Sequence, residues 1–281
     1  MKLKGKEIGG IFRRLRLERG YKIANFKEVG ISASSICRFE IGKSVLSTNK
    51  FFLALEFMEI SLSEFDYFYY NDHKRVEIID QIKKDYFHLN YSQLNNYLKT
   101  TQDPILKLSI KSLISSLSSK KKAIKSNDKD ILLSYLSKVS LWGTYELSIL
   151  SFITSELSKS QILYFLKEIL NDNPNFFENH YYEQLILFLY LQVSFHFLKL
   201  KEEIESQKAL DFIFKFSGEE HMFYQNIAFF FSGYHELIFN DCKVGRKKMQ
   251  NAINIFKLLK KPGQAQFLEK IIEEHIRNDE E

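Results

Sequence analysis

The hydrophobic pattern divides the first 66 residues into five short amphipathic segments. Ile8, Ile11, Phe12 and Leu15 follow the i, i+3, i+4, i+7 spacing of one helix face, and Gly20 ends this helix. A second short helix is predicted around Ile23 and Phe26, and a third runs from Ser32 to Glu40, between turns at Gly30 and Gly42. A fourth helix is predicted to begin at Ser47 or Thr48, with Phe51, Phe52, Leu55 and Met58 pointing inward. A fifth is predicted to begin at Ser61 or Ser63 and to continue through Phe65 and Phe68. Residues 1–66 therefore form a predicted five-helix domain.

Beyond a predicted linker at residues 67–72, stripes of helical spacing continue to the end of the chain. The predicted helices are 73–89, 91–100, 104–120, 128–139, 142–156, 159–171, 176–200, 202–216, 219–239, 243–260 and 263–277. Paired helices recur about every 35–45 residues, which is the period of a tetratricopeptide-like (TPR-like) α-solenoid. Residues 73–281 are therefore predicted to form a TPR-like helical domain.

Composition supports an all-α fold and locates the positive charge. The chain has only 11 Gly and 3 Pro, fewer turn residues than a β or α/β fold needs. The net charge is +5, and residues 1–66 contain 12 Lys and Arg against 8 Asp and Glu. A local positive field favours a polyanion through counterion release. The first domain is therefore expected to bind nucleic acid.

Residues 9–44 have the features of a helix-turn-helix that binds double-stranded DNA. Such a motif needs an apolar plug from each helix, a turn, and a polar face that reaches the base edges. The predicted plug consists of Phe12, Leu15, Phe26, Ile36 and Phe39. The predicted DNA-binding residues are Ser32, Ala33, Ser34 and Ser35, which are small enough to approach the groove floor, together with Arg38 and Lys43, which can reach a guanine edge or phosphates.

Four arginines of the first helix have two possible roles each. Arg13, Arg14 and Arg19 either contact phosphates or form an exposed basic face. Arg16 either contacts DNA or forms a structural ion pair with Glu40. Cys37 is either a small helix residue or a thiol switch, and the second role would need a lowered pKa.

The segments RRLRLERG and ISASSICRFEIGKS, followed by NKFFLALEFMEISLSEF, resemble the Rgg/GadR/MutR family of Gram-positive transcriptional regulators. The recognition-helix pattern of that family, S-x-S-x-[LI]-x-R-[FY]-E-x-G-x-S, is matched by Ser32, Ser34, Ile36, Arg38, Phe39, Glu40, Gly42 and Ser44. A second motif, W-G-x-Y-E-L, is similar to the segment from Trp142 to Leu147. The resemblance implies a homodimer in which residues 73–281 are the regulatory and dimerisation domain and bind a short, often hydrophobic, peptide pheromone.

Two residues depart from that family pattern. Ser35 stands where a Gln is usual, which removes an amide able to read adenine. Lys27 stands at a packing position where a small residue is usual, and it must extend outward. These departures favour the alternative function, a helical-repeat protein-interaction module whose vestigial helix-turn-helix no longer reads DNA.

Polar residues inside apolar helices mark a candidate peptide site. The spans 142–156, 176–200 and 219–239 are expected to line the concave face of the solenoid. Gln184, Gln225 and Asn226 are amides that a peptide backbone could satisfy. The aromatic residues Trp142, Tyr145 and Phe229 complete the predicted peptide-binding set, although Trp142 and Tyr145 can equally be core residues.

Other classes of protein are not supported by the sequence. The seven His and two Cys show no metal-binding spacing, so no metal site is expected. The chain contains no nucleophile-elbow, Walker or metalloprotease pattern, so neither catalysis nor a cofactor is expected. The apolar run at residues 185–191 is too short to span a bilayer. Cys37 and Cys242, without a signal peptide, indicate a cytoplasmic, reduced protein.

Overall fold

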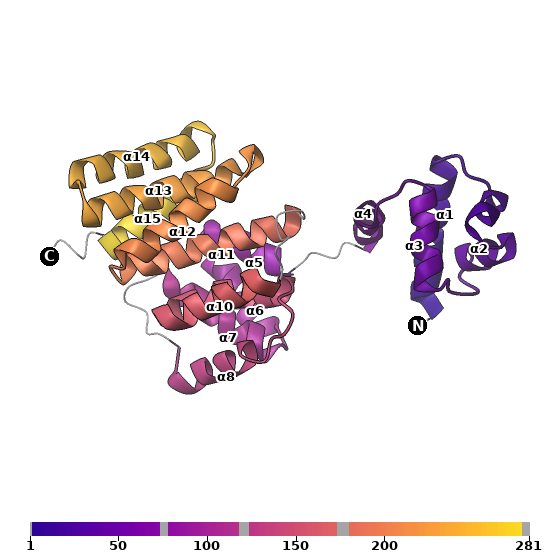
Figure 1. The fold of residues 1–281 in the computed structure, drawn as a ribbon, viewed down its shortest axis with the longest axis horizontal. Coiled ribbons are helices and arrows are strands. Elements are labelled where there is room, and N and C mark those ends of the chain that lie inside the picture. Colours follow the sequence, from indigo (N-terminus) through magenta and orange to yellow (C-terminus); the bar gives the residue numbers. More distant parts are fainter. Residues whose placement is uncertain (1, 74–77, 118–123, 173–179, 277–281) are drawn as a thin grey trace. The chain divides into compact units, whose positions relative to one another are not determined.

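The computed structural model describes residues 2–73, 78–117, 124–172 and 180–276, and every regular element within these ranges is helical. The chain divides into two compact units, Met1–Glu77 and Ile78–Glu281 (Figure 1). The predicted all-α class, with a small N-terminal domain followed by a helical repeat, is confirmed. None of the described helices combines the length and the apolar character needed to cross a bilayer.

The N-terminal unit contains the five predicted helices. They are α1 (Lys2–Glu18), the 3₁₀ helix η1 (Ile23–Val29), α2 (Ala33–Glu40), α3 (Thr48–Phe57) and α4 (Leu62–His73). Ser32 and Ser47 cap α2 and α3, because their side chains accept the backbone N–H of Ser35 and Lys50. The turns follow the predicted glycines, since Gly20, Gly30 and Gly42 have φ angles of 75°, 73° and 71°.

The core of the N-terminal unit is built around Phe12. The ring of Phe12 lies 5.3 Å from that of Phe39 and 5.8 Å from that of Phe26, measured between centroids. Gly9 allows this packing, because a Cβ at Gly9 would lie 2.1 Å from the carbonyl oxygen of Phe39. The predicted plug is therefore confirmed, and α1 and α2 meet at backbone distance.

Two predictions for this unit are wrong. The predicted linker at residues 67–72 lies inside α4, which continues to His73, and the two units divide at Glu77 instead. Apolar residues of α4 such as Phe65 and Phe68 pack on the N-terminal core and carry the helix through this stretch. Phe52 does not point inward. It is 46% exposed, because α3 buries its Leu55 side and Phe52 lies off that stripe.

The C-terminal unit contains the predicted succession of helices. They are α5 (Ile78–Phe87), α6 (Tyr91–Thr100), α7 (Pro104–Ser116), α8 (Ser126–Leu136), α9 (Thr144–Ile153), η2 (Thr154–Glu156), α10 (Lys159–Asp172), α11 (His180–Lys199), α12 (Glu203–Phe216), η4 (Glu219–His221), α13 (Met222–Phe239), α14 (Cys242–Leu258), α15 (Pro262–Ile271) and the π-helical turn η5 (Ile272–Ile276). In Figure 1 the helices α8, α10, α11, α12, α13 and α14 of this unit follow one another from bottom to top. The predicted extensions over 118–120 and 176–179 lie outside the described residues.

Helix α11 is the centre of this stack. All its side chains from Leu185 to Leu198 are buried, and the helix packs against α9, α12 and α13. Helix α5 covers a further side, because Phe87 lies 5.6 Å from Phe188 and 4.9 Å from Phe223 between ring centroids. The prediction that the span 176–200 lines a ligand groove stays a prediction, because Tyr190, Val193 and Phe197 of α11 line a hollow of about 460 Å³ together with residues of α10 and α12.

Helices α13 and α14 touch each other through a pair of glycines. A Cβ at Gly245 would lie 2.6 Å from the carbonyl oxygen of Gly233, and a Cβ at Gly233 would lie 2.9 Å from that of Gly245. Neither residue can carry a side chain without moving a backbone, so this contact fixes where the two helices are closest.

The stability of the C-terminal unit should depend on pH through His196. Its Nε2 lies 2.9 Å from the carbonyl oxygen of Leu157, and burial lowers its pKa from 6.5 to about 4. Lys199 and Lys129 also disfavour the imidazolium. The unfolded chain therefore takes up this proton first as pH falls from 6.5 towards 4, which destabilises the folded state by roughly 3 kcal/mol in total.

This contribution can be isolated by comparing urea unfolding of the parent and His196→Gln at pH 7 and pH 4. The variant should lose roughly 3 kcal/mol less stability over this interval than the parent. His88→Gln makes the same replacement at an exposed position and serves as the matched control. Equal losses for the parent and His196→Gln would contradict the prediction.

Candidate functional site

The recognition helix α2 presents a face of small and basic side chains. Ala33, Ser34, Cys37 and Arg38 are exposed and share one side of the helix, whereas Ile36 and Phe39 on the opposite side are buried. The hydroxyl of Ser32 lies 3.1 Å from that of Ser34 and 2.8 Å from that of Ser35. The start of α2 is therefore a compact serine cluster without a bulky side chain.

Basic side chains of α2, of the turn after it and of α1 are available for an external anion. Arg38, Lys43 and Arg13 are exposed, and among the described residues none of them has an ion-pair partner. The backbone N–H of Lys43 donates to the carbonyl oxygen of Arg38 at 2.8 Å, which keeps the two basic residues together at the end of α2. Arg14 is also exposed, and its guanidinium lies 5.7 Å above the ring of Phe68.

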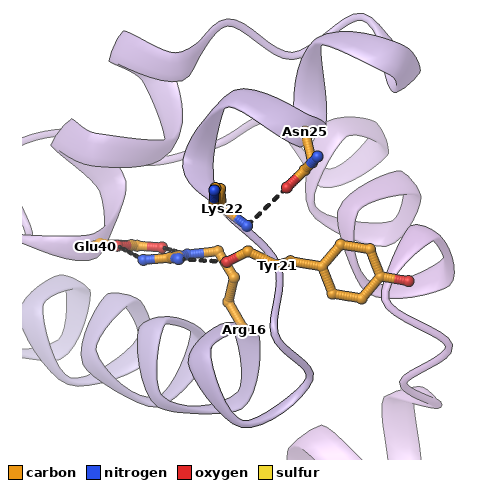
Figure 2. A network of polar contacts seen from close by, with 5 residues as sticks. All are labelled: Arg16, Tyr21, Lys22, Asn25 and Glu40. Carbon is orange, nitrogen blue, oxygen red and sulfur yellow. Dashed lines mark hydrogen bonds and ion pairs between the residues drawn. The ribbon is translucent and has the colours of Figure 1, made fainter.

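Arg16 has the structural role and not the DNA-contacting one. It is buried, with Nε donating to Oε1 of Glu40 at 2.6 Å and Nη2 donating to Oε2 at 2.9 Å (Figure 2). Its Nη1 donates to the carbonyl oxygen of Tyr21 at 2.7 Å. The guanidinium thus joins the end of α1, the following turn and the end of α2, and it holds the recognition helix against α1.

Removing the carboxylate of this pair should destabilise the N-terminal unit strongly. Glu40→Ala leaves a buried guanidinium without its counter-charge, which costs about 3–5 kcal/mol. The matched control is Glu64→Ala, which breaks the exposed pair with Arg19 and should cost less than about 1 kcal/mol. Chemical unfolding followed by amide exchange in residues 8–69 measures both values. A loss for Glu40→Ala no larger than the control would refute the structural role.

The C-terminal unit contains an apolar pocket of about 580 Å³ between the ends of α12 and α14, above the first turns of α13. Three predicted peptide-binding residues, Gln225, Asn226 and Phe229, line it. The other lining residues are Phe214, Met222, Phe223, Ile255, Phe256, Leu259, Lys261 and Gln264. The pocket has the size and the mostly apolar lining of a ligand site.

Asn226 has one satisfied and one unsatisfied polar atom. Its Nδ2 donates to the carbonyl oxygen of Ala252 at 2.9 Å, which fixes the orientation of the amide. Its Oδ1 is buried and has no hydrogen-bond partner in the described structure, and the residue as a whole is 7% exposed. A buried acceptor without a donor is costly, so a ligand N–H at this point would be favourable.

Gln225 completes the polar part of the wall. Its Nε2 donates to the carbonyl oxygens of Ser217 and Gly218 at 3.0 and 3.2 Å. These bonds tie the first turn of α13 to the end of α12. Both amides of α13 therefore have a structural bond, and Asn226 additionally has a vacant acceptor.

The remaining predicted peptide-binding residues lie outside this pocket. Trp142 precedes α9, is 2% exposed and packs against Phe165 at 5.8 Å, so the core interpretation applies to it. The hydroxyl of Tyr145 donates to Asp103, and burial followed by this bond raises the pKa of Tyr145. Gln184 is half-buried in α11. The predicted set thus divides into three pocket residues and three that are elsewhere.

Several pocket residues were not predicted from the sequence. Ile255 and Leu259 lie outside the buried face of α14, which contains Ala252 and Phe256. Apolar residues outside the face that packs on the core could have indicated a groove beside this helix. Lys261 stands directly before Pro262 in the turn to α15, where the sequence pattern indicates only a helix break.

A helix-turn-helix with an exposed recognition face, joined to a helical repeat, defines a class of transcriptional regulators. Residues 88–270 match the family described as HTH-type transcriptional regulator Rgg, C-terminal domain. The chain therefore belongs to the Rgg family, which confirms both the resemblance and the prediction of a regulator and not an enzyme. No curated protein matches the sequence.

Solved structures share the fold over nearly the whole chain. A putative transcriptional regulator from Listeria monocytogenes EGD-e has a TM-score of 0.76 at 19% identity, covering 98% of this chain and 99% of its own. The Streptococcus dysgalactiae SHP pheromone receptor Rgg2 has a TM-score of 0.68 at 21% identity, with 97% and 99% covered. ComR from S. thermophilus, solved with DNA and its signalling peptide ComS, has a TM-score of 0.56 at 14% identity, with 93% and 97% covered.

Proposed function

We propose that the protein is a homodimeric regulator that binds a specific DNA sequence through α2 and releases or tightens its hold when a short apolar peptide binds the C-terminal unit. The observation that carries the proposal is the exposed face of α2, on which Ala33, Ser34 and Arg38 are presented without bulky neighbours. In ComR, a protein of the same fold, the DNA and the signalling peptide are bound together.

The DNA contacts divide between bases and phosphates. Ser32 to Ser35 and Arg38 face the bases, where a guanidinium can bond a guanine bidentately. Lys43, Arg13 and Arg14 contact phosphates, which position the protein without reading sequence. A homodimer places two copies of α2 about 34–36 Å apart on a pseudo-palindromic site.

The pocket between α12 and α14 supplies the peptide site. Apolar side chains of the peptide fill the volume lined by Phe229 and its neighbours, and a backbone N–H of the peptide donates to Oδ1 of Asn226. A fatty acyl chain could fill the same volume but has no donor for this acceptor. The amide therefore favours a peptide over a lipid.

Lys261 determines which end of the peptide lies at the rim of the pocket. It is the one charged residue among those that line the pocket. An ammonium group at the rim favours the terminal carboxylate of a peptide whose last residue is apolar. Peptide binding then shifts the population between dimer geometries and thus the spacing of the two recognition helices.

DNA binding is tested with Arg38→Ala in a gel-shift titration against the promoter next to the protein's own gene. The variant should lose about 1–3 kcal/mol of affinity, and binding by the parent should weaken steeply with salt. Lys208→Ala removes one exposed positive charge from the other unit and is the matched control. Absence of any binding by the parent would favour the alternative, a protein-interaction module with a vestigial helix-turn-helix, to which Ser35 and Lys27 point.

Peptide binding is tested by screening apolar heptapeptides with free carboxyl termini and titrating those that bind. Asn226→Ala should weaken binding about tenfold through the lost N–H bond, and should cost about 1 kcal/mol of stability through the lost bond to Ala252. Asn254→Ala removes an exposed amide from α14 and should change neither quantity. Peptide affinity that is unchanged in Asn226→Ala would exclude this pocket as the site.

A further inference from the structure

A cluster of titratable side chains lies outside the DNA-binding face and outside the pocket lining. The Nε2 atom of His221, the last residue of η4, is 3.1 Å from Oε2 of Glu183 in the first turn of α11. Glu220 adjoins His221, and one nitrogen and two carboxylate oxygens from the three residues lie within 4.8 Å of one another. The donors come from segments about 38 residues apart and meet only in the fold.

Burial distinguishes this cluster from an ordinary surface group of carboxylates. His221 is 3% exposed and the side chain of Glu183 is 12% exposed, whereas Glu220 is exposed. Two of the three donors are therefore held in place by packing, and the third can approach from the solvent side. A buried carboxylate beside a second one is costly unless a positive charge compensates it.

The donor set indicates the class of ion. An imidazole with two carboxylates suits zinc and neighbouring divalent transition metals, whereas magnesium and calcium prefer oxygen ligands only. With bonds of about 2.0–2.2 Å, two ligands of a tetrahedral ion lie about 3.3–3.5 Å apart. The His221–Glu183 separation is close to this spacing, and a carboxylate oxygen of Glu220 lies within 4.8 Å of both ligand atoms.

We propose that Glu183, Glu220 and His221 form a divalent transition-metal site that ties the start of α11 to the turn before α13. Met222 and Phe223, which directly follow His221, line the apolar pocket together with Gln225 and Asn226. A bound ion braces this wall, so the metal regulates the shape of the pocket without contacting what the pocket holds. The site stands whether or not the pocket binds a peptide.

The test is a titration of the chelator-treated, full-length protein with ZnCl₂ and with MnCl₂, followed by calorimetry and by thermal unfolding. We expect one ion per chain and a higher unfolding temperature in the presence of metal. Glu183→Gln and His221→Asn should each weaken binding by about tenfold or more. Glu219→Gln changes an exposed carboxylate of the same turn and should bind like the parent.

Two further measurements separate this site from other causes. Unfolding without metal shows whether each variant is folded, and a folded Glu183→Gln that binds metal as tightly as Glu219→Gln overturns the proposal. Cobalt absorption tests the ligands, since the site should give only the weak bands of nitrogen and oxygen ligands. Intense thiolate bands that disappear in Cys37→Ser or Cys242→Ser would assign the ion to the exposed thiols and also overturn it.

Discussion

The burial of α11 from Leu185 to Leu198 is the constraint on which the C-terminal unit depends. A helix that is mostly apolar around its circumference must be covered by other helices, and here α5, α9, α12 and α13 provide most of the cover. The pocket of about 580 Å³ lies away from α11, between α12 and α14, the second helices of successive pairs, with α13 as its floor.

The sequence predicted what depends on neighbouring residues and missed what depends on distant ones. Helix caps at Ser32 and Ser47, the turns at the glycines and the Arg16–Glu40 pair follow from local spacing or from the family motif. Asn226 could be predicted because an amide inside an apolar helix needs a partner. The surroundings of Trp142 and the position of Lys261 depend on helices far away in sequence, whose packing the periodicity does not determine.

The departures from the family pattern in the N-terminal unit carry little structural cost. Lys27 is exposed in η1 and displaces no core residue, and Ser35 joins the serine cluster around the cap of α2. The ion pair between Arg16 and Glu40, together with the close approach of Gly9 to α2, fixes the angle between α1 and α2. Neither Lys27 nor Ser35 takes part in these contacts. The orientation of the recognition helix is thus separable from the chemistry that it presents.

The contact between Gly233 and Gly245 determines how a change in the angle between α13 and α14 affects the pocket. Because neither glycine carries a side chain, α13 and α14 approach to backbone distance there, so a change in the angle between the two helices turns about this point. Asn226 lies seven residues from Gly233 along α13, a distance of about 10 Å at about 1.5 Å per residue. A rotation of about 10° around the glycine pair therefore moves the pocket wall by roughly 2 Å. A small change in the angle at this glycine contact is therefore enough to alter the width of the pocket.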